Sequence, residues 1–219
     1  MLEKYIEQLY PLVISLFKDD SSGHDTSHLE RTMNIALYLQ KKEGGDRIII
    51  GIAAFLHDVH RIMQNESKVF VSPKDSLDKI KDILKHITLS KEQIEKICYC
   101  IEYHEEYNWN GTNVSDINTL ILQDADNLDA IGAIGIGRTF SYGGSHKIPM
   151  YDSNIPLNKS DDYSEFEGND PSTIHHFYHK LFKLKENMNT KTAKKLAIKR
   201  TKYMKKFIKE FLDEWNGIK

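Results

Sequence analysis

Two short motifs bring imidazole and carboxylate groups close together, as metal binding or proton transfer requires. The first is Gly-His-Asp-x-x-His, in which His24 and His28 are four residues apart and Asp25 lies between them. This spacing puts both imidazoles on the same side of a helix. The second is His57-Asp58, at the end of the most apolar stretch of the chain. A charged pair there is costly unless it is neutralised, and metal coordination is one of the few ways to neutralise it.

A third motif is the acidic string Gln-Asp-Ala-Asp-Asn-Leu-Asp-Ala, which places Asp124, Asp126 and Asp129 within six residues. Its neighbours are rich in Ile, Leu and Ala, which argues against a solvated acidic face. Clustered carboxylates repel one another, and a bound cation removes that cost. Imidazoles and carboxylates together suit a divalent ion and leave positions for water and a phosphate oxygen. The three motifs therefore predict a divalent metal centre.

Helices are expected to carry these motifs. Helical periodicity predicts helices over residues 2–17 and 25–43, and the apolar stretch 47–57 is interpreted as a buried helix rather than a strand. Capping signals predict further helices, which begin after Ser72-Pro73, Ser90, Ser115, Asp170-Pro171 and Asn189 or Thr190. No β-hairpin signal stands out. We therefore expect an all-α fold, a single-domain helical bundle.

One domain is expected to cover residues 1–219, with the metal-site core at about 23–144 and C-terminal helices at about 171–215. Residues 141–169 contain Gly, Pro, Asn, Asp and Tyr without periodicity, so we expect a functional loop or lid there. Lysines are frequent from Lys191 to Lys209 and indicate a solvated helix face, with a weak anion-attracting surface as the alternative. The His175, His176 and His179 group has no fitting carboxylate pattern and is expected to pack over the core.

The composition limits the partners. A formal charge of -2 gives no general attraction to nucleic acid or to anionic membranes. No apolar run approaches the ~20 residues that span a bilayer, and the first residues are unlike a secretory signal. Cys98 and Cys100 are interpreted as reduced, buried thiols. We expect a cytoplasmic protein that binds a small phosphorylated molecule, with no nucleic acid or membrane as partner.

The ordered set His28, then His57-Asp58, then Asp126 resembles the H…HD…D signature of the HD-domain phosphohydrolase superfamily. The strings Gly-His-Asp-x-x-His, Ala-x-Leu-His-Asp and Gln-Asp-Ala-Asp-x-Leu-Asp-Ala-Ile-Gly-Ala-Ile-Gly-Ile-x-Arg-Thr-Phe are similar to a bacterial branch of HD-domain hydrolases and nucleotide pyrophosphohydrolases. The likeness covers residues 23–144. It implies that these four residues hold the ion, for which Mn²⁺ is expected, with Mg²⁺, Fe²⁺, Ni²⁺ and Zn²⁺ as alternatives.

The resemblance also implies the reaction, metal-assisted hydrolysis of a nucleotide phosphoester or phosphoanhydride, such as pyrophosphohydrolysis of nucleoside triphosphates. The alternatives are another phosphorylated metabolite (a nucleoside monophosphate, a cyclic nucleotide or an alarmone) and a non-catalytic nucleotide sensor. His24, Asp25 or Asp58 is expected to move the proton. Many HD nucleotidases carry a glutamate three residues after the HD aspartate, and Arg61 stands there instead, which favours phosphate binding at that position.

Further residues are expected to bind substrate or a second ion. Arg138 is a second candidate phosphate clamp beside Arg61, and Lys68 is a weaker one. His104 continues the inward face of the preceding helix and is either a core histidine or a site residue. Some HD enzymes hold a second metal with additional histidines, for which His86 and His104 are the candidates.

Overall fold

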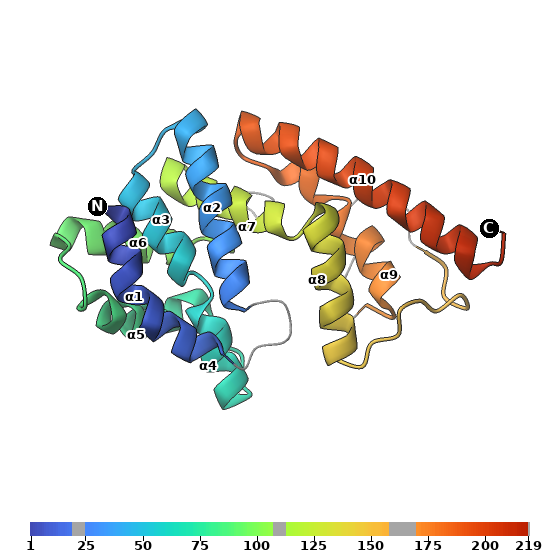
Figure 1. Ribbon diagram of the computed structural model, residues 1–219, viewed down its shortest axis with the longest axis horizontal. Coiled ribbons are helices and arrows are strands. Elements are labelled where there is room, and N and C mark those ends of the chain that lie inside the picture. The colour runs from blue at the N-terminus through green and yellow to red at the C-terminus, as the bar shows by residue number, and fades with distance from the viewer. Residues whose placement is uncertain (19–24, 107–112, 158–169, 219) are drawn as a thin grey trace. The chain divides into compact units, whose positions relative to one another are not determined.

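Helices make up all the regular secondary structure in this computed structural model, and none of the residues it describes forms a strand (Figure 1). It describes residues 1–18, 25–106, 113–157 and 170–218. Among the described helices, none is long and apolar enough to cross a membrane. The predicted all-α class is confirmed. The α-helices are α1 (Leu2–Phe17), α2 (Thr26–Glu43), α3 (Arg47–Leu56), α4 (Val59–Ser67), α5 (Leu77–Leu84), α6 (Lys91–Glu102), α7 (Ile117–Asp129), α8 (Gly132–Ser145), α9 (Thr173–His176) and α10 (Lys191–Trp215).

Short helices of other types also occur among the described residues. They are the 3₁₀ helices η1 (Pro73–Ser76) and η5 (Leu184–Asn187) and the π-helix η4 (Phe177–Leu181). The described residues form two compact units, the first up to residue 126 and the second from residue 127 onward. The single domain expected over residues 1–219 stays a prediction.

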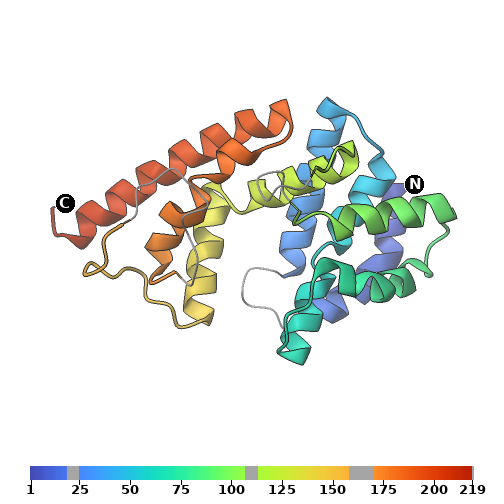
Figure 2. The ribbon, with the colours of Figure 1, turned by 180° about the vertical axis from the view of Figure 1, so that it is seen from behind.

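The first unit is built around α3, whose residues from Ile49 to Leu56 are all buried. Helices α1, α2 and α6 pack against it, and α2 and α3 lie side by side in both views (Figures 1 and 2). A helix that is apolar all round is stable only inside such a core. Asp46 begins the helix, since its carboxylate accepts hydrogen bonds from the N–H groups of Ile48 and Ile49. The predicted helix is confirmed, and its end delivers His57 to the interior.

Two capping predictions are wrong by one or two residues. The residue before α7 is Asp116, not Ser115, and its Oδ2 accepts hydrogen bonds of 2.8 Å from both the N–H and the hydroxyl of Thr119. A carboxylate stabilises a helix N-terminus by its charge as well as by these bonds. Helix α9 is capped by Ser172, whose Oγ accepts from a helix N–H, while the carboxylate of Asp170 binds histidine side chains.

The predicted loop at 141–169 begins too early, because α8 continues to Ser145. The two glycines in this stretch do not end the helix. Gly143 is buried, and a Cβ atom there would lie 2.3 Å from Thr173 Oγ1, so the absent side chain allows a close approach. Residues 146–157 are irregular, and residues 158–169 lie outside the described part of the chain. The function of this loop as a lid stays a prediction.

The second unit is organised by α10, which packs against α8 (Figures 1 and 2). The helix begins after Thr190, as predicted, and the Thr190 hydroxyl accepts the N–H of Ala193. Its opposite side is lined with exposed lysines. The buried side shows the helical period: Ala193, Ala197, Thr201, Met204 and Ile208.

Candidate metal centre

Four helices of the first unit, or the residues next to their ends, carry the predicted ligands. His28 is in the first turn of α2, where the carboxylate of Asp25 accepts its backbone N–H at 2.9 Å. His57 follows α3, Asp58 precedes α4, and Asp126 is on α7. His28 and His57 are fully buried, the side chain of Asp58 is 4% exposed, and that of Asp126 is 24% exposed. The group is therefore largely enclosed, and Asp126 is its most exposed member.

The donor atoms of these four residues converge. His28 Nε2 lies 3.2 Å from His57 Nε2, 3.3 Å from Asp58 Oδ2 and 3.5 Å from Asp126 Oδ1. His57 Nε2 lies 3.7 Å from Asp58 Oδ1 and 3.8 Å from Asp126 Oδ1. Donors bound to one cation at metal–ligand distances of about 2.1 Å lie roughly 3.0–3.5 Å apart. The observed spacing thus fits a divalent ion among two nitrogen and two oxygen ligands.

The protonation of His57 suits it to bind a cation. Its Nδ1 lies 2.9 Å from the carbonyl oxygen of Ala54, to which it donates. Burial lowers the pKa of His57 to about 4, against the opposing effect of Asp58 and Asp126. The imidazole is therefore neutral at pH 7, with its Nε2 lone pair directed at His28 and the two carboxylates. Neutral imidazole and ionised carboxylate are the forms that bind divalent metals.

A second group of possible metal ligands adjoins the first and shares Asp58 with it. Asp58, His60 and His104 each offer a donor atom within 4.8 Å of the others, and all three are buried. The Nδ1 atoms of the two histidines donate to the carbonyls of His57 and Ile101, at 3.1 and 2.7 Å. Their Nε2 atoms are buried and make no hydrogen bond within the described residues. Burial also lowers the pKa of His60 to about 4, so this group too could hold a cation.

Two members of this second group, Asp58 and His104, were named from the sequence, and the third was missed. His104 is fully buried, as its helix face predicted, and its contact with substrate stays a prediction. His86 is exposed and belongs to neither of these ligand groups. The missed residue is His60, three positions after His57 at the start of the next helix. The available signal was a second histidine only three positions after His57, directly beyond the most apolar stretch of the chain.

Arg61 lies at the edge of the centre. Its side chain is 33% exposed, its Nε is 3.7 Å from Asp58 Oδ1, and its Nη2 forms an ion pair with Glu105. Glu105 also lies near the second group, with Oε2 3.8 Å from His60 Nε2. Sequence reasoning missed this glutamate because it belongs to none of the motifs. A guanidinium so placed can interact with a phosphate oxygen bound nearby.

The other predicted site residues have varied surroundings. Lys68 is exposed, in a left-handed conformation at the end of α4. Arg138 belongs to the second unit, where its Nη1 lies 3.0 Å from Asp129 Oδ2. His24 lies outside the described residues. Their roles, and the proton-transfer role of Asp25, stay predictions.

A carboxylate in the second unit corrects one expectation. Asp170 accepts hydrogen bonds from His176 Nδ1 at 2.6 Å and from His179 Nδ1 at 2.8 Å. The expectation that no carboxylate accompanies these histidines is wrong, because Asp170 was assigned to a helix cap instead. Burial raises the pKa of Asp170, but the two histidines lower it by more, so the net pKa is below the ordinary value.

Comparison with known proteins agrees with the architecture. The family model of the HD domain matches residues 26–131, a span that includes all four predicted ligands. The protein YpgQ of Bacillus subtilis is 32% identical over 98% of this chain and 96% of its own length. A crystal structure of a HD-superfamily hydrolase from Bacillus thuringiensis is 36% identical over 99% of both chains, with a TM-score of 0.73. The crystal structure of YpgQ in complex with ADP has a TM-score of 0.71, at 29% identity over 97% of this chain and 99% of that one. This chain belongs to the HD-domain family.

Proposed function

We propose that this protein is a divalent-metal-dependent phosphohydrolase that acts on a nucleotide, with Mn²⁺ as its working ion. The observation that carries the proposal is the convergence of His28, His57, Asp58 and Asp126, in which each histidine Nε2 lies 3.2–3.8 Å from the other imidazole and from oxygens of both carboxylates. A mixed nitrogen and oxygen set of this kind suits Mn²⁺ and similar borderline ions. The ADP bound in the YpgQ crystal structure supports a nucleotide as the ligand.

The specific reaction that we propose is hydrolysis of a nucleoside triphosphate to a monophosphate and pyrophosphate. Water forms a bond to the α-phosphorus, the bond to the bridging oxygen breaks, and pyrophosphate leaves. A divalent ion, when bound, supplies Lewis-acid polarisation of the phosphoryl oxygen and lowers the pKa of water.

The protein's own residues supply the rest of this mechanism. Asp58 orients the reacting groups and is a candidate to take the proton from water, as are Asp25 and His24. Arg61 balances the charge that develops on the phosphoryl oxygens, because its guanidinium is only 3.7 Å from Asp58 and is partly exposed. Arg138, Lys68 and His104 are proposed to contact the remainder of the substrate.

The test is a nucleotide panel assayed with chelated protein and with protein restored with Mn²⁺. Nucleoside triphosphates, monophosphates, cyclic nucleotides and alarmones are offered, and the products are separated by chromatography. We expect monophosphate and pyrophosphate from triphosphates, only with metal. If only another class of compound is hydrolysed, that class replaces nucleoside triphosphates as the proposed substrate. Turnover after exhaustive chelation would refute the metal-dependent mechanism.

A matched pair of histidine variants tests the centre itself. His57→Gln should abolish turnover and bound metal, whereas His86→Gln should leave both unchanged, since His86 is exposed and outside the ligand groups. Nucleotide binding without turnover of any substrate in the metal-loaded wild type would indicate the alternative, a non-catalytic sensor.

A further inference from the structure

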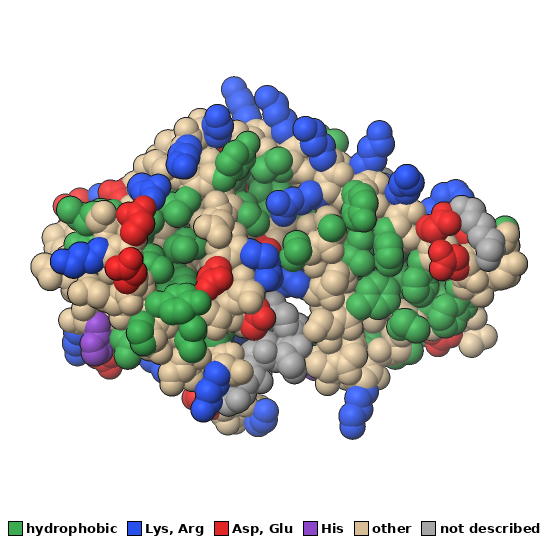
Figure 3. Space-filling view, in the orientation of Figure 1, with side chains coloured by type: hydrophobic (Ala, Val, Ile, Leu, Met, Phe, Trp, Pro, Cys, Tyr) green, Lys and Arg blue, Asp and Glu red, His purple; other side chains and the backbone are tan. Residues whose placement is uncertain are grey.

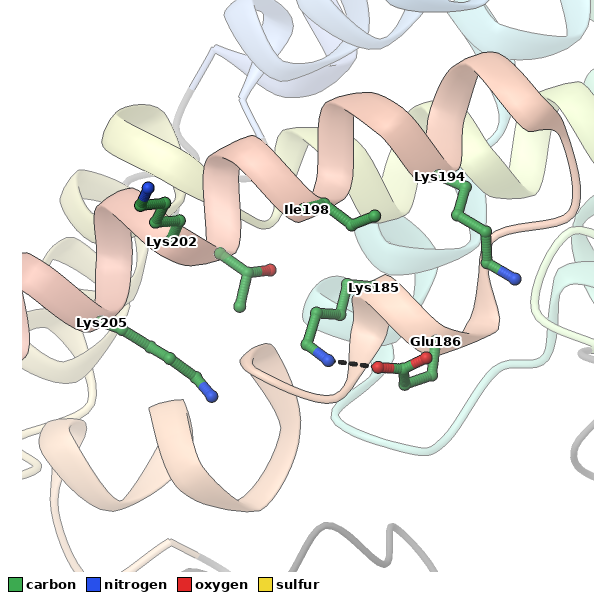
Figure 4. A pocket seen from close by; sticks show the side chains of 7 residues that line it. Lys185, Glu186, Lys194, Ile198, Lys202 and Lys205 are labelled. Carbon is green, nitrogen blue, oxygen red and sulfur yellow. Dashed lines mark hydrogen bonds and ion pairs between the residues drawn. The ribbon is translucent and has the colours of Figure 1, made fainter.

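The second unit contains a pocket whose wall is rich in lysine (Figure 4). Three lysines come from α10, namely Lys194, Lys202 and Lys205, and a fourth, Lys185, comes from η5. With the single carboxylate of Glu186, these side chains give the wall a formal charge of four minus one, or +3. Figure 3 shows that Lys and Arg side chains are gathered along the edge formed by α10. The pocket differs from that general surface because its lysines meet lysine and glutamate from another helix.

Three of these lysines, Lys185, Lys194 and Lys205, act electrostatically on the carboxylate of Glu186. Figure 4 shows Lys194 and Lys205 extending from α10 toward the segment that carries Lys185 and Glu186, whereas the ammonium group of Lys202 points away from it. Lys185 forms an ion pair with Glu186. The hydrogen bond from Lys185, and then the charges of Lys194 and Lys205, lower the pKa of Glu186. The Glu186 carboxylate is therefore an anion held among three cations.

A buried hydroxyl on the same wall has no partner. Thr201 lines the pocket and is 1% exposed. Its Oγ1 makes no hydrogen bond within the described residues. A buried hydroxyl without a hydrogen bond is destabilising, so native proteins seldom leave one in this state. A rotation of the Thr201 side chain toward the pocket would let the oxygen of a bound ligand satisfy this hydroxyl, within the influence of the lysines.

We propose that this pocket binds the diphosphate group of a small molecule, as inorganic pyrophosphate or as part of a nucleotide. Lysine ammonium groups are compact, strongly charged donors that bind phosphate oxygens. Separate ammonium groups on two segments suit a ligand with several anionic oxygens better than a single carboxylate. The exposed side chain of Ile198, also on the wall, offers an apolar contact for a nucleoside. The site is made of residues outside the metal centre, so the proposal does not depend on the proposed hydrolysis.

The first experiment measures pyrophosphate binding by calorimetry on the full chain in the presence of a chelator, so that no metal ion takes part. Lys194→Gln combined with Lys205→Gln should weaken binding at least about tenfold, since each replacement removes a charge-assisted interaction. The matched control is Lys199→Gln combined with Lys206→Gln, which removes two charges from the same helix outside the pocket wall. The control should bind as the wild type does. An equal loss in both double variants would overturn the proposal in favour of a diffuse basic surface.

Two further variants make predictions that general charge does not. Glu186→Gln should strengthen pyrophosphate binding, because it releases Lys185, whereas Glu214→Gln on the same protein should not. Thr201→Val should weaken binding and at the same time raise the melting temperature without ligand, because an unpartnered buried hydroxyl is removed. A purely structural role for Thr201 predicts no change in binding. If the affinity of the Glu186 and Thr201 variants equals that of the wild type, the pocket is not the site.

The ligand class is tested by competition. ADP should displace bound pyrophosphate, and pyrophosphate should displace bound ADP. Tighter binding of ADP than of pyrophosphate would indicate an additional contact with the nucleoside at the same site. Failure of both to bind the chelated wild-type protein would overturn the proposal. Displacement of pyrophosphate by single-stranded DNA, at a phosphate concentration similar to that of ADP, would also overturn it. The surface would then be a nucleic-acid site.

Discussion

Replacement of Asp58 by asparagine should remove metal-induced stabilisation without harming the fold. The side chain is 4% exposed, and its two oxygens lie 3.3 Å from His28 Nε2 and 3.7 Å from His57 Nε2. Asparagine keeps the size and one oxygen but loses the negative charge that a divalent ion requires. A ligand at one hundred times its dissociation constant stabilises the folded state by about 2.7 kcal/mol. For a chain of this size, that corresponds to a rise in melting temperature of roughly 5–11 °C.

In the absence of metal, we expect Asp58→Asn to leave the stability of the fold unchanged or to raise it, whereas an ordinary core mutation lowers it. Without a cation, the carboxylates of Asp58 and Asp126 both lie within 3.5 Å of the same imidazole nitrogen of His28. Two acids in one enclosed site disfavour each other's ionised form. Asp58→Asn relieves that repulsion, so the chelated variant should be at least as stable as the chelated wild type. A variant that merely misfolds would melt at a lower temperature in both conditions.

The assay is thermal unfolding of both proteins with chelator and with excess Mn²⁺. Asp46→Asn is the matched control, because asparagine caps a helix as well as aspartate does and Asp46 caps α3 outside the centre. The control should retain the full metal-induced shift. The reasoning is refuted if Asp58→Asn shows the same shift as the wild type, or if the wild type shows none with any of the candidate ions.

Three further perturbations test other parts of the structure. Asp25→Asn should lower kcat about a hundredfold if Asp25 transfers the proton, while the melting temperature stays constant because the helix cap is kept; an unchanged kcat would limit Asp25 to capping. Arg61→Gln should lower kcat/KM by about a hundredfold through loss of a phosphate contact. Glu105→Gln, which releases Arg61 from its ion pair, should not lower kcat/KM, and steady-state kinetics on both variants tests the difference. Gly143→Ala should lower the free energy of unfolding by about 1–3 kcal/mol, since its Cβ would lie 2.3 Å from a hydroxyl of α9. Gly144→Ala, with open space around it, should raise the free energy of unfolding by about 0.5–1 kcal/mol. Denaturant unfolding measures both changes.

The sequence predicted the helices and the proximity of the four predicted ligands because both depend on regular patterns. The apolar residues on every side of α3 could only be buried inside a core, and His57 at its end had to face that core. The ordered motif then related three distant segments, and in the structure the Nε2 atoms of His28 and His57 lie 3.2–3.8 Å from each other and from oxygens of Asp58 and Asp126. Local cap chemistry was less certain. Neighbouring Ser115 and Asp116 are both good caps, and only the full geometry distinguishes them.

The contacts around the ligands could not be predicted in the same way. Glu105 reaches Arg61 across 44 residues of sequence, and no motif relates the two. Asp170 looked like a cap because proline follows it, yet its carboxylate is used by two histidines. In both cases a short local pattern had two possible outcomes. The choice was made by tertiary packing, which brings in a partner that the local sequence does not contain.

The buried histidines share one local device that explains why they are competent for chemistry. In His57, His60 and His104, Nδ1 donates to the carbonyl of the residue three positions earlier. Helix ends leave backbone carbonyls without intrahelical partners, and two of these histidines immediately follow the helices α3 and α6 or their cap. This hydrogen bond places a proton on Nδ1 and fixes the orientation of the ring. In the neutral imidazole the remaining nitrogen, Nε2, presents a lone pair to the interior, where for His60 and His104 it has no hydrogen-bond partner among the described residues. A histidine just past a buried helix is therefore oriented by the backbone itself, with Nε2 turned toward the interior.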